Sequence, residues 1–70
     1  MQELKELRRM AGWTQAKASR ATGVNRSKLS QVECGEIDLS PAEEVAVRRV
    51  LVAAVRERAA RLQVVLANKA

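Results

Sequence analysis

The sequence lacks histidine, tyrosine and phenylalanine, and it contains one cysteine, one proline and one tryptophan among 70 residues. A single cysteine cannot form a disulfide within the chain, and without histidine the usual zinc sites are excluded. Without histidine or tyrosine, acid–base catalysis near neutral pH would require carboxylates or lysines in a pocket. A chain of this length is too small to form such a pocket readily. The three glycines lie apart, so no glycine-rich phosphate loop is present. We expect no enzymatic activity, no metal and no cofactor.

Long apolar runs are also missing. No stretch of 18 apolar residues occurs, so no transmembrane helix is expected. The first ten residues, MQELKELRRM, are amphipathic and charged, unlike the apolar core of a signal peptide. These two absences predict a cytoplasmic protein with no membrane partner.

Aromatic residues are scarce, since Trp13 is the only one. The core must therefore be built from Leu, Val, Ala, Ile and Met, which bury little surface in so small a domain. Added burial through a partner chain is expected. The one cysteine, Cys34, is interpreted as a small packing residue, with a redox sensor as the alternative.

Positive charge is in excess and unevenly placed. The net charge is +5. Residues 1–35 carry seven lysines and arginines against three acidic residues, whereas residues 36–70 carry six against five. An excess in the first half suits contact with phosphates, but charge alone is equally compatible with an ordinary basic surface.

The segment TQAKASRATGVNRSKLSQVECG, residues 14–35, is the most informative part of the chain. A helix is predicted over Thr14–Ala21, where the threonine caps the start and Gly23 accommodates the left-handed conformation at the end. Asn25 is the expected cap of a second helix, Arg26–Cys34, which Gly35 ends in the same way. Two helices joined by so short a turn must cross steeply, which predicts a helix-turn-helix.

Helices are predicted on both sides of this segment. The first spans Gln2–Ala11, with Leu4 and Leu7 on its apolar face and Gly12 ending it. The sequence Ser40-Pro41-Ala42-Glu43 combines a capping serine, proline at the first helical position and glutamate three residues after the cap. It predicts one uninterrupted helix from Pro41 to about Asn68, which would span about 40 Å. The stripe expected to close the core consists of Val47, Val50, Leu51 and Ala54.

The apolar pattern of this long helix continues past the point where the core should end, in the three-four spacing of a coiled-coil seam. A second copy of the chain is the expected partner, which gives a two-fold homodimer. A frayed tail, a helix folded back over its own domain and a different protein partner are the alternatives. The expected interface residues are Val52, Val55, Ala59, Leu62, Val65 and Leu66.

The chain resembles the phage-repressor and Cro-type helix-turn-helix proteins over residues 3–35. The residues that carry the resemblance are Leu4, Leu7, Arg8, Thr14, Gln15, Gly23, Val24, Leu29, Val32, Glu33 and Gly35. The resemblance implies an ion pair between Arg8 and Glu33, which ties the first helix to the third. Ala18 departs from the usual leucine, and Trp13 is expected to fill the gap. The uninterrupted last helix is a second departure, because the family normally divides this region in two.

The resemblance also implies where DNA binds. It puts Gln15 on a phosphate and the start of the third helix, together with Gln31, on bases. The Arg26 guanidinium matches guanine O6 and N7, with a phosphate contact as the alternative, and Gln31 suits adenine. Lys5 or Arg9 could add a phosphate contact. The expected base contacts are Asn25, Arg26, Ser27, Ser30 and Gln31, and the expected phosphate contacts are Thr14, Gln15, Lys17, Arg20 and Lys28.

Together these patterns predict an all-α protein in which three short helices are followed by one long C-terminal helix. Residues 1–39 form the helix-turn-helix region, and residues 40–70 close the core and form the dimer interface. The expected function is that of a small dimeric repressor, of phage or bacterial origin, which binds double-stranded DNA at an inverted-repeat operator. The alternative is a protein-interaction module, such as an antitoxin, whose long helix binds a partner protein.

Overall fold

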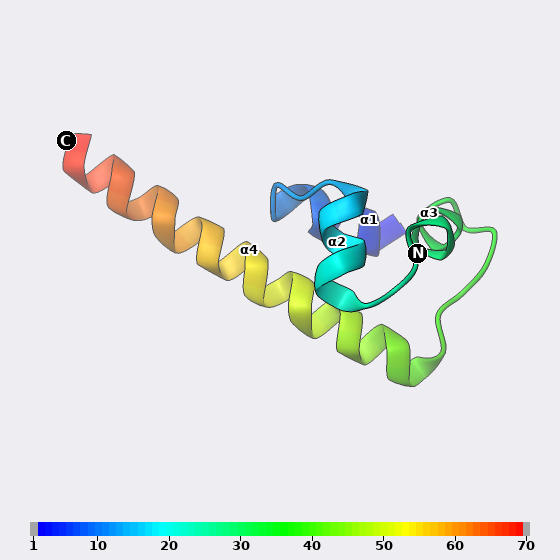
Figure 1. Ribbon diagram of the computed structural model, residues 1–70. Coiled ribbons are helices and arrows are strands. Elements are labelled where there is room, and N and C mark those ends of the chain that lie inside the picture. Colours follow the sequence, from blue (N-terminus) through cyan, green and yellow to red (C-terminus); the bar gives the residue numbers. More distant parts are fainter. Residues whose placement is uncertain (1, 70) are drawn as a thin grey trace.

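The computed structural model describes residues 2–69. It contains four helices in this range, α1 (Gln2–Met10), α2 (Gln15–Thr22), α3 (Arg26–Glu33) and α4 (Pro41–Lys69). The three short helices pack against the first half of α4, and the second half projects away from them (Figure 1). The all-α prediction, with three short helices before a long one, is confirmed.

The core lies between the three short helices and the first four turns of α4. Its largest fully buried side chains are Leu4, Leu29, Val32, Val47 and Leu51. Leu7 and Trp13 pack against this cluster while partly buried. The predicted stripe on α4 does close the core, since Ala54 is also buried and Val50 is half-buried.

The turn between α2 and α3 is set by Gly23, which has a φ of 76°. Its backbone N–H donates to the Ser19 carbonyl at 2.9 Å, the bond that closes an αL cap. The Ser19 hydroxyl in turn donates to the Val24 carbonyl at 2.6 Å, which fastens α2 to the chain after the turn. Since a side chain at this φ is strained, glycine is the residue type that the turn requires.

Two arginines of α4 hold α1 in place. Arg48 donates to Glu3 and, at 3.0 Å, to Glu44 on its own helix. Farther along, the Arg58 guanidinium donates to the Met10 carbonyl at 3.1 Å, and so partly satisfies the end of α1. A Cβ on Gly12 would lie 2.8 Å from Arg58 Nη1, so the turn after α1 passes close to the end of the Arg58 side chain. Among the hydrogen bonds from α4 to α1 described above, those of Arg58 lie nearest the C-terminal end of α4.

Beyond Arg58 the long helix is exposed. Every residue from 59 to 69 is exposed to solvent, including Leu62, Val64, Val65 and Leu66. The longest dimension of the structure is 45 Å against 19 Å for the other two, because this half of α4 extends outward. The expectation that the helix outruns its core is therefore confirmed.

Two details differ from the expectations. Helix bounds differ from the predicted ones by one residue. Ala11 and Cys34 lie just after α1 and α3, α2 begins after Thr14 and ends at Thr22, and α4 ends at Lys69. Cys34 was expected to pack in the interior, but it is exposed. It stands seven residues after Ser27 and therefore on the same outward side of α3, opposite the buried Leu29.

The start of α4 is closed by the predicted capping box. The Ser40 N–H donates to Glu43 Oε1 at 3.1 Å, and the Glu43 N–H donates to Ser40 Oγ at 3.2 Å. Glu43 also accepts from Lys28 Nζ at 2.8 Å. This bond from Lys28, followed by those from Ser40, lowers the pKa of Glu43 from 4.5 to about 2.

The lowered pKa of Glu43 predicts an acid-dependent contribution to stability. The contribution is complete above pH 4.5 and is lost as the pH falls from 4.5 to about 2, because the folded state resists protonation of this group. We expect Glu43→Gln to destabilise the fold at pH 7, and we expect this effect to shrink steadily as the pH falls from 4.5 through about 2. Urea unfolding of both proteins across this range measures the difference. An effect of E43Q that is the same at pH 7 and at about pH 2 would contradict the assignment.

Candidate nucleic-acid interface

The exposed side of α3 forms the centre of the candidate interface. Asn25 caps the helix by accepting from the Ser27 N–H at 2.8 Å. Leu29 and Val32 are buried and hold α3 on the core, so the opposite side of the helix faces outward. Arg26, Ser27 and Gln31 are exposed there. A rigid helix that shows polar and basic side chains to solvent is the form in which helix-turn-helix proteins enter the major groove.

The predicted base-contacting residues all lie on or next to the exposed side of α3, but they differ in how much of each side chain is available to DNA. Asn25 uses its Oδ1 in the cap and keeps its amide hydrogens for other partners. Ser30 is half-buried, so it offers less surface than its neighbours. Arg26 and Gln31, the two side chains suited to bidentate base contacts, are both exposed.

A buried ionic cluster fixes α3 relative to the rest of the motif. Arg8 donates to both carboxylate oxygens of Glu33, at 2.8 and 3.0 Å, and to the Trp13 carbonyl at 2.8 Å. Gln15 donates to the same carboxylate at 3.3 Å. The Glu33 side chain is 2% exposed and that of Arg8 is 13% exposed. One carboxylate therefore joins α1, α2 and α3, and Arg8 connects the turn after α1 to the same cluster.

The expected phosphate contacts at the start of α2 already have intramolecular roles. Thr14 caps the helix by accepting from the Lys17 N–H at 3.1 Å. Gln15 is half-buried and is oriented by its bond to Glu33. Lys17 is exposed, and its Nζ lies 5.4 Å from the centre of the Trp13 ring, a cation–π distance. Free N–H groups at a helix start favour anions, and these contacts hold the polar side chains near that start.

The other two expected phosphate contacts differ from each other. Arg20 is exposed in the last turn of α2. Lys28 is half-buried and its Nζ lies 2.8 Å from Glu43 Oε2 at the start of α4. A phosphate at Lys28 would therefore meet an ammonium group whose charge a carboxylate already offsets.

Three contacts of the candidate site were missed by sequence reasoning. Glu43 was identified as part of a capping box but not as a partner of Lys28, from which it is separated by 15 residues. The contact of Lys17 with Trp13 and the bond from Gln15 to Glu33 were missed as well. Of these three contacts, the one between Lys17 and Trp13 alone has a local sequence signal, which is the spacing of four positions between the two residues.

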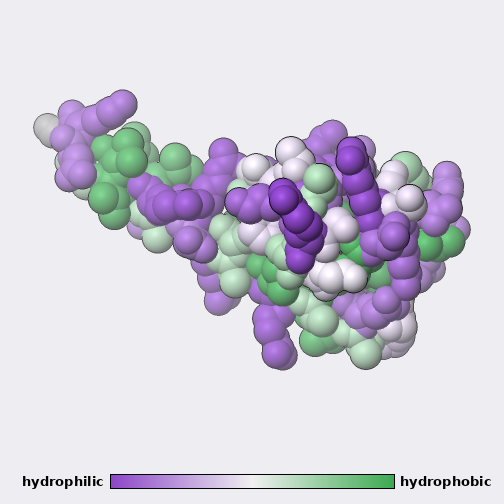
Figure 2. Space-filling model, in the orientation of Figure 1, coloured by the Kyte–Doolittle hydropathy of each residue, from purple (hydrophilic) through white to green (hydrophobic). Residues whose placement is uncertain are grey.

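The predicted interface on α4 divides into two parts. Val52 and Val55 are half-buried beside the core, whereas Ala59, Leu62, Val65 and Leu66 are exposed on the projecting half. Val64 was not among the predicted residues, yet it is 60% exposed. Figure 2 shows apolar side chains gathered toward the outer end of α4.

Other kinds of site have no support within residues 2–69. No three histidine, cysteine, aspartate or glutamate side chains of this range are placed to hold a metal ion. None of the helices described is both long and apolar enough to cross a membrane.

Comparison with known proteins agrees with this geometry. No curated protein and no solved structure matches the chain significantly. A family model described as a helix-turn-helix domain matches residues 2–64. The match extends well past residue 35, where the resemblance ended, and it includes most of α4. The chain therefore belongs to this helix-turn-helix domain family, which is part of the Cro and repressor-type group.

Proposed function

We propose that the protein is a sequence-specific transcriptional regulator, a small repressor that binds an inverted-repeat operator in the cytoplasm of a bacterial host. The observation that carries the proposal is the exposed side of α3, where Arg26, Ser27 and Gln31 face outward from a helix fixed by the buried Glu33. Arg26 and Gln31 contact bases, and the basic residues of α2 contact phosphates. The regulator acts by occupying its operator.

The proposed active form is a homodimer joined through the projecting half of α4. Leu62 and Leu66 are 51% and 67% exposed, and Ala59 lies on the same side of the helix. Leu62 follows Ala59 by three positions and Leu66 follows Leu62 by four, so the three side chains line one side of the helix and form a seam. Burying this seam against a second copy removes apolar surface from water and presents two α3 helices to one duplex.

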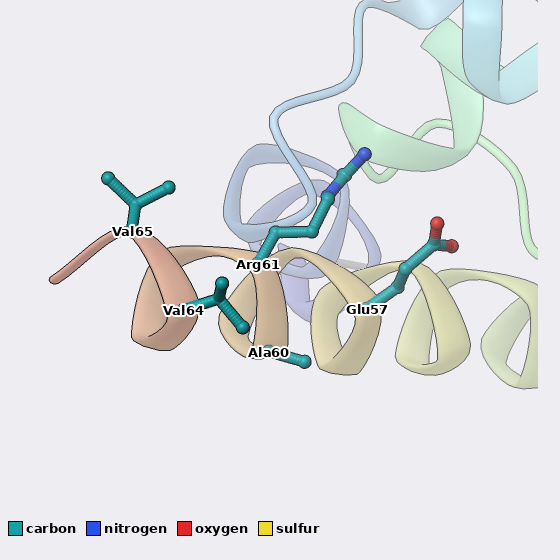
Figure 3. A pocket seen from close by; sticks show the side chains of 5 residues that line it. All are labelled: Glu57, Ala60, Arg61, Val64 and Val65. Atoms are coloured by element: carbon teal, nitrogen blue, oxygen red, sulfur yellow. The ribbon is translucent and has the colours of Figure 1, made fainter. Parts of the chain in front are cut away.

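A second candidate function is supported by another apolar surface of the same half-helix. A shallow hollow is lined by Glu57, Ala60, Arg61, Val64 and Val65, which rise from successive turns of α4 (Figure 3). The helix turns by about 200° between Leu62 and Val64, so the hollow lies largely away from the seam. A different protein partner, as in an antitoxin, would cover this side and make DNA binding secondary.

Substitution of Arg26 tests the base-contact assignment. We expect Arg26→Ala to weaken binding to a selected operator by about 1–3 kcal/mol and to relax the preference at one base pair. Arg20→Ala is the control, because a phosphate contact is lost on every sequence alike. Titration of operator and random duplexes measures both losses. An equal loss for R26A on the two duplexes would show that Arg26 contacts phosphate only.

The mass of the purified chain distinguishes the two candidate functions. Sedimentation equilibrium at micromolar concentration should give twice the 7.7 kDa of one chain, and the dimer should bind duplex DNA. A monomer that leaves Leu62 and Leu66 exposed and binds no duplex would favour the partner-protein function instead.

A further inference from the structure

One ion pair joins the candidate DNA-contacting surface to α4. Lys28 is the only residue in the first turn of α3 that is half-buried, whereas Arg26 and Ser27 beside it are exposed. Its ammonium group lies 2.8 Å from Glu43, and the two side chains are 40% and 39% exposed. The pair is thus accessible to solvent and to a ligand of α3.

The carboxylate of this pair is held in a fixed position. Glu43 Oε1 accepts from the Ser40 backbone N–H, and Oε2 accepts from Lys28. The first turn of α4 therefore orients Glu43 toward α3. The pKa of Glu43, lowered to about 2, keeps the carboxylate ionised at neutral pH.

We infer that Glu43 acts as an internal competitor for DNA phosphate at Lys28. The inference rests on the proposed DNA-binding function. A carboxylate with two oxygens offers the ammonium group the same kind of charge-assisted hydrogen bond as a phosphate does. A phosphate that approaches Lys28 must compete with the Glu43 carboxylate for this ammonium group, so part of the gain from that contact is cancelled. Glu43 is a positioning residue that acts through Lys28.

The consequence concerns the sequence-independent part of binding. Each phosphate neutralised by a lysine or arginine contributes about 0.9 to the slope of log affinity against log salt. Because Lys28 is paired with Glu43, the protein neutralises fewer phosphates of a random-sequence duplex than the number of its exposed lysines and arginines would indicate. A small chain with a net charge of +5 is then less readily retained on random sequence.

The test compares Glu43→Gln with Glu44→Gln on a random-sequence duplex at several salt concentrations. Glutamine preserves the capping box, and both variants add the same net charge. Glu44 is a matched control because its partner Arg48 keeps a second partner, Glu3. For E43Q we expect a slope steeper by about 0.9 per bound protomer and binding about fivefold tighter at 0.1 M salt. For E44Q we expect the wild-type slope.

A double substitution shows whether the effect passes through Lys28. In a Lys28→Gln background, E43Q should leave the slope unchanged. If E43Q proves too unstable to assay, K28Q should reduce the wild-type slope less than Arg20→Gln does, because the Lys28 contact is already offset. Equal slopes and affinities for wild type, E43Q and E44Q would overturn the inference while leaving the proposed function intact. Absence of any duplex binding by the folded wild-type protein would overturn the proposed function itself.

Discussion

Replacing Leu62 and Leu66 together with glutamate is expected to convert the proposed dimer to monomers and to weaken operator binding at least about 100-fold. Two linked binding modules bind about 10²–10⁴-fold more tightly than either module alone. A monomer carries one helix-turn-helix and so loses that gain in affinity. Both leucines are exposed in the protomer, so the helix-turn-helix itself should fold normally. Sedimentation and operator titration measure the two losses.

The double variant Gln63→Glu and Asn68→Glu is the matched control. It adds the same charge to the same turns of α4 and removes no apolar side chain, and both residues are exposed. We expect this control to remain largely dimeric. A stable dimer of the Leu62→Glu, Leu66→Glu variant would place the interface elsewhere.

Removing Arg8 is expected to have the largest effect on folding. Arg8→Met would leave the Glu33 carboxylate, 2% exposed, with only the 3.3 Å bond from Gln15 among its side-chain partners described above. Breaking a buried ion pair from one side costs about 3–5 kcal/mol. A domain of this size rarely has more than about 3–5 kcal/mol in total, so R8M should be largely unfolded at 25 °C. Circular dichroism with urea titration measures this change.

Two further variants separate the ion pair from general loss of charge. Arg9→Met removes an exposed arginine next to Arg8 and should leave the unfolding midpoint nearly unchanged. The double variant Arg8→Met, Glu33→Met removes both charges and should recover much of the lost stability. Equal midpoints for R8M and R9M would contradict a structural role for the buried pair.

The sequence was sufficient to predict most of the local structure, because helix ends have local chemical signals. Thr14, Asn25 and Ser40 each cap a helix, and Gly23 ends one. Each of these signals acts within four residues of the position that it determines. The three short helices and the uninterrupted α4 follow from them and from the apolar spacing.

The contacts of the candidate site were less predictable. Arg8 and Glu33 were paired only through the family resemblance, since they are 25 positions apart in the sequence. The pair of Lys28 and Glu43 depends on how the loop after α3 brings the start of α4 back beside α3, and no local pattern determines that placement. The prediction that Cys34 packs in the core was wrong for a different reason, because a local signal did exist. Its spacing of seven from Ser27 places Cys34 on the outward side of α3.

Selection of bound sequences from a random duplex pool tests the central claim most directly, that α4 presents two α3 helices to one DNA duplex. We predict enrichment of an inverted repeat whose half-sites are centred about ten base pairs, or about 34 Å, apart. Enrichment should disappear for the Leu62→Glu, Leu66→Glu variant. A single unrepeated motif, or no enriched sequence at all with a folded dimer, would contradict the account.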